Sequence, residues 1–257
     1  MQHIPRKRFG QHFLRDQGVI HKIVAALAPQ TKDHLIEIGP GQGAITLPVL
    51  RIAKSLEAIE LDRDLIPELK ERCHHAGNLE VHEADVLEFN FLSIKQDDRL
   101  LRIFGNLPYN ISTPLLFHLM DFEDIIADML FMVQKEVGDR LSAETDTEHY
   151  GRLSVMIQYH WQVDLLFDVP PGAFHPPPKV TSSIVRLKPY AVYPDRAKNY
   201  STFASVVKHA FGQRRKTLRN SLKGIVSDEI WEQLSIKSNL RAENLSVNDF
   251  VMIANYI

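Results

Sequence analysis

The sequence predicts an α/β protein with a mainly parallel sheet. Strand-like and helix-like segments alternate from Gly18 to about Val137, which is typical of consecutive βαβ units. A glycine-rich loop follows the first strand-like segment, and polar residues stand at the ends of three later ones. Because ligands of open α/β sheets bind at the carboxyl ends of the strands, we expect one binding site along that edge.

The last quarter of the chain predicts a separate small domain of helices. The stretch from Pro189 to Pro194 has the composition of a linker. We therefore expect residues 1–190 to form the α/β domain, with a basic N-terminal segment at 1–17, and residues 191–257 to form an all-α domain. A chain of 257 residues is long enough for both.

The glycine-rich loop is Glu37-Ile-Gly-Pro-Gly-Gln-Gly43, directly after the strand-like segment 34–36. Glycine permits a positive φ and lets a ligand approach the backbone, and a helix expected over 44–53 would direct its amide N–H groups at the loop. The dinucleotide-binding fingerprint needs its third glycine three residues after the second. Gly43 follows Gly41 by only two residues, so the spacing argues against a dehydrogenase.

Two carboxylates follow the next two strand-like segments. Glu60 comes directly after residues 56–59 and lies 21 residues after Gly39. A carboxylate at this place can accept hydrogen bonds from both ribose hydroxyls of a bound nucleoside. Asp85 comes directly after residues 79–84 and can accept a hydrogen bond from an adenine amine. Either residue alone could instead cap a helix, but their order after the glycine loop predicts a nucleoside site.

The tetrapeptide Asn106-Leu-Pro-Tyr109 follows the apolar run 100–105. The Asn106 amide oxygen and a free backbone carbonyl can accept hydrogen bonds from an exocyclic amine, and the Tyr109 ring can stack on a planar base. A strand followed by a plain proline turn is the alternative for this segment taken alone. Together with the nucleoside site, the tetrapeptide predicts chemistry on the amino group of a base.

These motifs together resemble those of S-adenosylmethionine-dependent adenine-N6 methyltransferases. Longer blocks are similar to the bacterial small-subunit (16S) ribosomal RNA adenine-N6,N6-dimethyltransferases, and this similarity spans roughly residues 5 to 257. The blocks are Arg8-Phe-Gly-Gln-His-Phe-Leu14, Asn106-Leu-Pro-Tyr-Asn-Ile-Ser-Thr-Pro-Leu115, Phe174-His-Pro-Pro-Pro-Lys-Val180 and Gln213-Arg-Arg-Lys-Thr-Leu-Arg-Asn220.

The resemblance implies a fold, a cofactor and a reaction. The fold is the seven-stranded, Rossmann-like class I S-adenosylmethionine-dependent methyltransferase fold, in which segments 163–167 and 183–187 complete the sheet and the last strand is antiparallel. The cofactor is S-adenosyl-L-methionine. The reaction is dimethylation of N6 on two adjacent adenosines near the 3′ end of small-subunit ribosomal RNA, during ribosome biogenesis.

The resemblance also implies roles for particular residues. The implied catalytic residues are Asn106, Leu107, Pro108, Tyr109 and Phe174. The implied cofactor-binding residues are His12, Leu14, Gly39, Gly41, Glu60, Leu61, Asp85, Val86 and Asn106. Tyr109 and Phe174 would sandwich an adenine that has left its stack. His12 stands where the family usually has Asn, which leaves a side-chain contact to the cofactor open but would preserve a backbone contact.

Basic residues are concentrated in two segments, the N-terminal residues 1–17 and the C-terminal residues 191–257, although the net charge of the chain is only −2. Residues 191–257 carry ten Lys and Arg against six Asp and Glu, and the stretch 196–227 has eight basic residues and no acidic one. Helical spacing of its apolar residues predicts a helix pair with basic faces. Such runs are usually solvated helix faces, but beside a base-modifying site they predict phosphate binding. The predicted RNA-binding residues are Arg6, Lys7, Arg8, Arg214, Arg215, Lys216, Arg219 and Lys223.

The remaining composition fits an enzyme of the cytoplasm. Hydrophobic residues make up 44% of the chain and charged residues 24%. The single Cys73 excludes an internal disulfide. We expect neither a signal peptide nor a membrane span, and the twelve His residues show no spacing that predicts a metal site. The partner implied by the resemblance is the immature small (30S) ribosomal subunit, and we expect a monomer.

Three alternatives share part of this chemistry. An erythromycin-resistance-type methyltransferase modifies large-subunit ribosomal RNA adenine through similar motifs, although the 213–220 block and the proline-rich loop 170–178 argue against it. A ribosome-assembly factor would act mainly by binding, although the intact glycine loop and tetrapeptide favour catalysis. A DNA adenine methyltransferase more often has an Asp-Pro-Pro-Tyr-like segment at the end of the strand.

Overall fold

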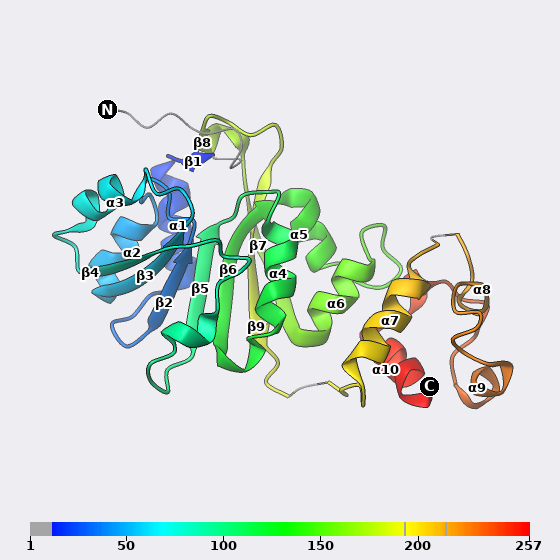
Figure 1. Cartoon of the computed structure of the whole chain (residues 1–257). Coiled ribbons are helices and arrows are strands. Elements are labelled where there is room, and N and C mark those ends of the chain that lie inside the picture. The colour runs from blue at the N-terminus through cyan, green and yellow to red at the C-terminus, as the bar shows by residue number, and fades with distance from the viewer. Residues whose placement is uncertain (1–11, 193, 214) are drawn as a thin grey trace. The chain divides into compact units, whose positions relative to one another are not determined.

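The structure is a computed structural model that describes residues 12–192, 194–213 and 215–257 (Figure 1). The chain divides into two compact units. The first unit contains the residues up to 138 together with 164–189, and the second contains 139–163 and 190–257. Among the described residues, no helix is long and apolar enough to cross a membrane.

A seven-stranded sheet forms the centre of the first unit. Its strands in chain order are β2 (His34–Ile38), β3 (Ser55–Glu60), β4 (Asn78–Glu83), β5 (Leu101–Asn106), β6 (Ile126–Gln134), β7 (Trp161–Val169) and β9 (Ser182–Pro189). The order across the sheet is β4-β3-β2-β5-β6-β9-β7. Strands β2 to β6 are parallel, and β9 runs antiparallel to β6. The predicted α/β fold with a seven-stranded sheet and an antiparallel last strand is confirmed.

The pattern of burial follows from the position of each strand. β6 lies inside the sheet, and its central residues 129–133 are all buried, which explains their continuous apolar sequence. β4 is an edge strand and has no fully buried residue. Accordingly, its residues 78–82 alternate between polar and apolar side chains.

Helices of the first unit cover the sheet. They are α1 (Gln17–Leu27), α2 (Thr46–Ala53), α3 (Ile66–Cys73) and α4 (Ser112–Met120), with short 3₁₀ helices η2 (Phe91–Ile94), η3 (Glu123–Ile125) and η4 (Pro171–Ala173). Helices α1, α2 and α3 share one hydrophobic cluster with the sheet residues Leu35, Leu56 and Phe104. The helix expected over 44–53 after the glycine loop begins at Thr46, since Ala44 and Ile45 still belong to the turn.

The second unit consists of helices. They are α6 (Arg152–His160), α7 (Tyr200–Ala210), α8 (Leu218–Ser221), α9 (Asp228–Gln233) and α10 (Val247–Tyr256), with the 3₁₀ helix η5 (Ala242–Asn244), while α5 (Lys135–Leu141) spans a limit between the units. The predicted boundary near residue 190 is one limit of this unit, but residues 139–163 also belong to it. The reason is shared packing: the Tyr159 ring stacks on Phe203 with centroids 4.3 Å apart, and the Tyr150 hydroxyl donates to the Leu245 carbonyl at 2.8 Å.

Gly105 brings the end of β5 close to the end of β2. A Cβ atom at position 105 would collide with the backbone carbonyl oxygen of Ile38. Only glycine leaves room for this approach, so the residue before Asn106 is fixed by backbone packing and not by a turn. Asn106 is thereby held beside the loop that follows β2.

Replacing Gly105 with Ala should destabilise the first unit. The new Cβ meets backbone atoms, which cannot rotate away as a flexible side chain can, so β2 and β5 must separate locally. We expect the free energy of unfolding to fall by about 1–3 kcal/mol, measured by urea denaturation. Gly172→Ala is the matched control, because a Cβ there meets nothing within 4 Å; its change should stay within about 0.5 kcal/mol. Equal losses in the two variants would refute the packing argument.

Candidate active site

The carboxyl ends of β2, β3, β4 and β5 surround a cavity of about 360 Å³. Its size is that of a small-molecule site. The predicted residues that line it are His12, Leu14, Gly39, Gly41, Glu60, Leu61, Asp85, Val86, Asn106, Leu107, Pro108 and Tyr109. The sequence therefore located the cavity, and Phe174 is the one described residue of the two predicted sets, catalytic and cofactor-binding, that does not line it.

The glycine loop approaches the cavity with a backbone that only glycine adopts easily. Gly41 has a φ of +54°, and a Cβ there would lie 3.1 Å from the Phe13 ring. Its amide N–H donates to Glu60 Oε2 at 3.1 Å. The loop is thus tied to the end of β3 and exposes backbone, not side chains, to a ligand.

Glu60 is held in place by two backbone N–H groups. Oε2 accepts from Gly41 as described, and Oε1 accepts from the Asp62 amide at 2.8 Å. Only 7% of Glu60 is exposed, and this burial raises the pKa of its carboxyl. The two N–H groups lower the pKa, but the effect of burial is larger. A buried carboxylate fixed in this way is ready to accept from a neighbouring pair of hydroxyl groups.

Asp85 combines a local role with a position on the cavity wall. Its Oδ1 accepts from the Leu87 amide at 2.9 Å, which stabilises the turn after β4. The alternative role for Asp85 is to cap a helix by accepting from a backbone N–H group. Asp85 does accept such a bond, but within a turn. The residue nevertheless lines the cavity, together with its buried neighbour Val86.

Asn106 has a defined orientation at the end of β5. Its Nδ2 donates to the His12 carbonyl at 3.0 Å. Because this bond uses the amide nitrogen, Oδ1 is the atom of the Asn106 side chain that can accept a hydrogen bond from a ligand. The His12 ring in turn donates from Nδ1 to the Pro176 carbonyl at 2.8 Å, since a carbonyl can only accept.

The backbone carbonyls of the tetrapeptide are not equivalent. The Pro108 carbonyl accepts from the Ile111 amide at 3.1 Å, and the Tyr109 carbonyl accepts from the Ser112 hydroxyl at 3.1 Å. Among the hydrogen bonds of the described residues, none ends on the Leu107 carbonyl. Leu107 therefore offers the free backbone acceptor next to Asn106.

Tyr109 is half-buried and partnered at its hydroxyl. The hydroxyl forms a 2.8 Å hydrogen bond with Ser182 Oγ on β9. Burial raises the pKa of Tyr109, so the phenol stays protonated at neutral pH. Its ring lies 5.7 Å from the His12 ring, measured between centroids.

Phe174 lies apart from the cavity. It is on β8 (Phe174–His175), which pairs with β1 (Phe13–Leu14) so that Phe174 stands opposite Leu14. Only 5% of Phe174 is exposed, and its side chain belongs to the hydrophobic cluster that α1, α2 and α3 share with the sheet. The structure thus places Tyr109 on the cavity wall and Phe174 outside it, and the sandwich of a base between the two rings stays a prediction.

Comparison with known proteins gives the family. The profile of a family described as "Ribosomal RNA adenine dimethylase" matches residues 2–257. The chain belongs to this family. It is 54% identical over 257 residues to the "Ribosomal RNA small subunit methyltransferase A" of Methylococcus capsulatus, covering 100% of this chain and 99% of that one.

Two solved structures are also similar to this chain. A dimethyladenosine transferase from Plasmodium falciparum has a TM-score of 0.78 at 27% identity. The match covers 94% of this chain and 96% of the Plasmodium chain. The 23S rRNA methyltransferase ErmE has a TM-score of 0.73 at 22% identity, over 95% and 98% of the two chains, which shows the fold alone. The chain is thus an S-adenosylmethionine-dependent ribosomal RNA methyltransferase with the class I fold.

The cavity fits the cofactor of this methyltransferase family. S-adenosylmethionine has a ribose with two free hydroxyls, an adenine and a charged methionine end. The buried Glu60 carboxylate, the positive-φ loop at Gly41 and the apolar Val86 match these groups in kind.

Sequence reasoning missed further residues that line the same cavity, and three of them bear on its chemistry. They are Phe13, Glu37 and Asp62. Glu37 is part of the glycine motif, but the sequence does not show that its carboxyl is 2% exposed with Oε2 lacking a hydrogen-bond partner among the described residues. Burial raises the pKa of Glu37 to about 8; the Thr46 hydroxyl lowers it and the charge of Glu60 raises it.

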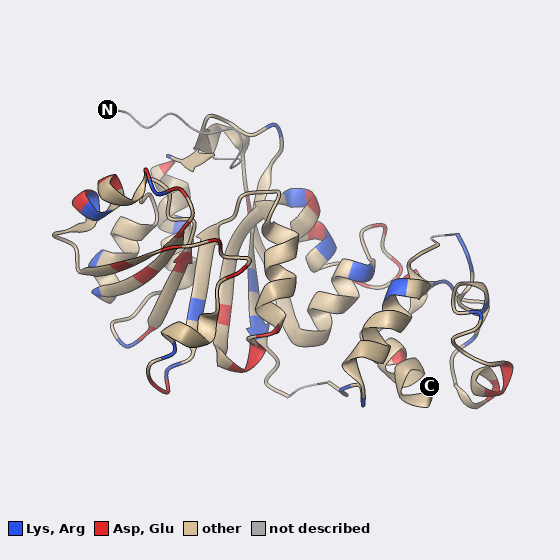
Figure 2. Ribbon diagram, in the orientation of Figure 1, with Lys and Arg blue, Asp and Glu red and all other residues tan. Residues whose placement is uncertain are grey.

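The predicted RNA-binding residues lie partly outside the described residues. Arg6, Lys7, Arg8 and Arg214 fall there. Arg215, Lys216, Arg219 and Lys223 are exposed in the second unit, but not on a helix pair as predicted: the first two lie between α7 and α8, and α8 itself is one turn (Figure 2). Arg219 forms a 2.7 Å ion pair with Asp228 of α9.

Glu37→Gln should change how stability depends on pH. A carboxyl whose pKa is raised on folding stabilises the folded state fully below its unfolded pKa, near 4.5, and loses this contribution as the pH rises through about 8. We expect the unfolding free energy of the unchanged protein to fall over this range and that of the variant to fall less. At pH 8 the variant should be more stable by about 2–5 kcal/mol.

Urea denaturation at several pH values between about 5 and 8 measures this difference. The slope should be reduced and not abolished, because the pKa of Glu60 is raised as well. Glu71→Gln on the exposed side of α3 is the control and should leave the slope unchanged. Parallel curves for the Glu37→Gln variant and the unchanged protein would contradict a buried, protonated Glu37.

Proposed function

We propose that this methyltransferase transfers two methyl groups to N6 of each of two adjacent adenosines near the 3′ end of small-subunit ribosomal RNA. The observation that carries the proposal is the fixed Asn106 amide, whose Nδ2 bond to His12 leaves Oδ1 as an acceptor at the cavity. Such an acceptor suits an exocyclic amine. The 54% identity to a small-subunit methyltransferase supports the choice of the small-subunit RNA.

The amine needs two acceptors to become a nucleophile. The lone pair of adenine N6 is delocalised into the ring, so the nitrogen attacks only when its hydrogens are held out of the ring plane. In the proposal, Asn106 Oδ1 takes one hydrogen and the Leu107 carbonyl takes the other. Pro108 is the weaker candidate for the second acceptor, because its carbonyl already accepts from Ile111.

The cofactor is bound by the other side of the cavity. S-adenosylmethionine supplies an electrophilic methyl group on a sulfonium. Glu60 would bind the ribose hydroxyls, Asp85 the adenine amine through its remaining oxygen, and Gly39 and Gly41 would contact the ligand through their backbone. These residues hold the donor toward Asn106, and positioning of this kind supplies a large part of the rate.

Tyr109 would stack on the extruded adenine. Base–aromatic stacking is worth about 1–3 kcal/mol per base. The bond from the Tyr109 hydroxyl to Ser182 fixes the ring for this purpose. Phe174 would reach the second face of the base only after leaving its hydrophobic cluster, so the proposal rests on Tyr109.

The second transfer uses one acceptor fewer. A once-methylated amine carries a single hydrogen, which Asn106 Oδ1 can hold while the methyl group occupies the space on the Leu107 side. No residue has to act as a general base during transfer, because the positively charged product amine loses its proton readily to water. Dimethylation therefore requires room at the amine and no additional catalytic group.

Basic residues of the chain would hold the RNA. Arg215, Lys216, Arg219 and Lys223 are exposed and can contact phosphates, together with Arg6, Lys7, Arg8 and Arg214, which lie outside the described residues. We propose an immature 30S subunit in the cytoplasm as the substrate and a monomeric enzyme.

The function is tested with subunits that lack the modification. The chain is incubated with radiolabelled S-adenosylmethionine and undermethylated small subunits, the RNA is digested, and the nucleosides are separated. Labelled N6,N6-dimethyladenosine at two adjacent positions is the expected result. Label in large subunits offered in parallel would favour the erythromycin-resistance-type activity, and binding of subunits without any label would favour an assembly factor.

Asn106→Ala should slow methyl transfer by about 100- to 1,000-fold, because an unmethylated amine that has only one of its two hydrogens held keeps its lone pair in the ring. Single-turnover assays with excess enzyme measure the transfer step directly. Asn110→Ala is the matched control, since Asn110 lines the same cavity but is exposed. Near-normal single-turnover rates in the Asn106 variant would remove this residue from the mechanism.

Glu60→Ala should weaken cofactor binding by about one to two decades, as expected for losing charge-assisted hydrogen bonds. Calorimetric titration with S-adenosylhomocysteine measures the loss. The same titration with its 2′-deoxy analogue isolates the ribose contact: the unchanged protein should discriminate against the analogue, and the variant should not. Discrimination that persists in the variant would assign the ribose to another residue.

A further inference from the structure

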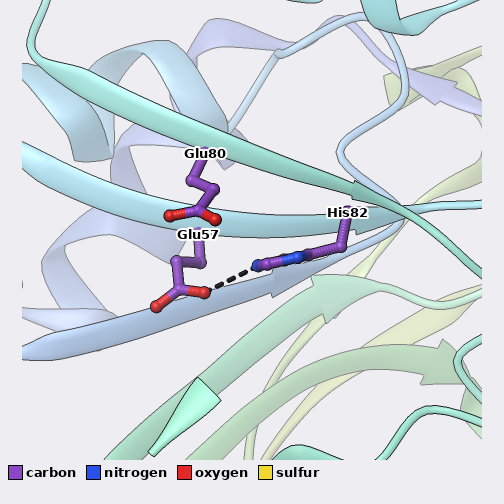
Figure 3. A group of neighbouring side chains, drawn as sticks. All are labelled: Glu57, Glu80 and His82. Atoms are coloured by element: carbon purple, nitrogen blue, oxygen red, sulfur yellow. Dashed lines mark hydrogen bonds and ion pairs between the residues drawn. The ribbon is translucent and has the colours of Figure 1, made fainter. Parts of the chain in front are cut away.

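A second group of ionisable side chains lies on the sheet away from the active-site cavity. Glu57 on β3 and Glu80 and His82 on β4 each present a ligand atom, and these three atoms lie within 4.8 Å of one another (Figure 3). His34 on β2 adjoins the group through Glu57. None of the four lines the active-site cavity.

The register of the strands explains why these side chains converge. Glu57 and Glu80 are direct partners in the parallel pair β3–β4, and His82 follows Glu80 by two residues, so it points the same way. Their neighbours Leu56, Leu79 and Val81 pack with the α1–α3 cluster. The ionisable group therefore projects from the opposite face of the sheet.

Hydrogen bonds already orient the central carboxylate. Glu57 Oε1 lies 2.7 Å from His34 Nε2, and Glu57 Oε2 lies 2.7 Å from His82 Nε2. Glu57 and His82 are largely buried, with 16% and 22% of their side chains exposed. The His82 imidazole thus faces a carboxylate oxygen, Glu57 Oε2, that makes no other hydrogen bond among the described residues.

A separate polar cavity adjoins the group. Its volume is about 170 Å³, and His34, Glu57 and Glu80 are among the residues that line it. Only 7% of His34 is exposed, and its Nδ1 has no hydrogen-bond partner among the described residues. The buried His34 imidazole thus holds Glu57 in place through Nε2 beside a polar cavity that both residues line.

We propose that Glu57, Glu80 and His82 form a binding site for a divalent transition-metal ion such as Zn²⁺. Glu57 Oε2, one Glu80 oxygen and His82 Nε2 are the three protein ligands, and water completes a four-coordinate shell. His34 donates to the other oxygen of Glu57 and so orients the ligating carboxylate, as outer partners of metal ligands commonly do.

The donor set selects the class of ion. Imidazole nitrogen suits zinc and its neighbours in the transition series, whereas Mg²⁺ prefers an octahedron of oxygens and keeps its waters. Binding replaces the hydrogen between His82 and Glu57 with the metal, and the displaced proton goes to solvent. The ion would then join the edge strand β4 to β3. Its ligand His82 lies three residues before Asp85, and its ligand Glu57 lies three residues before Glu60.

Calorimetric titration of the whole chain with Zn²⁺ tests the site. The unchanged protein should bind one ion tightly, with a raised melting temperature, and Mg²⁺ should do neither. His82→Gln and Glu80→Gln should each abolish this binding event. His34→Gln should weaken it by about 10- to 100-fold, because His34 acts only through Glu57.

The matched control removes imidazoles that do not belong to the site. His74 and His75 are exposed neighbours at the end of α3 and could bind Zn²⁺ on their own. The double variant His74→Gln/His75→Gln should keep the one-ion event. The visible spectrum of the Co²⁺-loaded unchanged protein gives a readout that needs no variant: four-coordinate nitrogen and oxygen ligation is expected.

Three results would overturn the proposal. They are the absence of a saturable one-ion event in the unchanged protein, an event that survives His82→Gln in a protein that circular dichroism shows to be folded, and a Co²⁺ spectrum of a hexaaqua-like ion. Methyl transfer plays no part in these readouts, so they stand apart from the outcome of the subunit assay.

Discussion

The hydrogen bond from Asn106 Nδ2 to the His12 carbonyl joins the two parts of the chain on which the candidate active site depends. One part is the end of β5, and the other is the segment just before β1. The bond decides which end of the Asn106 amide faces a ligand. The contact to Asn106 comes from the His12 backbone, so it does not depend on the side chain at this position, and the imidazole bonds to the Pro176 carbonyl instead.

Close packing of backbones places that bond next to the glycine loop. Gly105 lets β5 approach Ile38, and Gly41 lets the loop approach Phe13. The donor side and the acceptor side of the proposed reaction therefore lie at the same sheet edge, where close backbone packing sets their positions. This placement suits a transfer whose rate depends on alignment more than on acid–base chemistry.

The sequence predicted the sheet and the cavity because both follow from local rules: strand periodicity, glycine spacing and polar residues at strand ends. It could not predict where Phe174 lies, because that depends on the pairing of β8 with β1, between residues far apart in the chain. The sequence also could not predict that residues 139–163 belong to the second unit. That assignment depends on packing between aromatic residues far apart in the chain, such as Tyr159 and Phe203. The group around Glu57 was missed for a related reason: its residues are spaced irregularly along the chain, and only the strand register brings them together.

Two buried carboxyls next to each other give the cavity an unusual charge balance. Glu37 has a pKa raised to about 8, so at neutral pH it is mostly uncharged beside Glu60. Burial is the main cause of the raised pKa of Glu37, and repulsion from the charge of Glu60 adds to it; protonating Glu37 removes both costs. The methyl donor carries a sulfonium, an ammonium and a carboxylate, a net positive charge, and positive charge near a carboxyl lowers its pKa. Under the proposed function, cofactor binding would therefore draw a proton off Glu37 and be favoured by rising pH, whereas the folded state itself is favoured by falling pH, so the same carboxyl sets stability and cofactor affinity against each other.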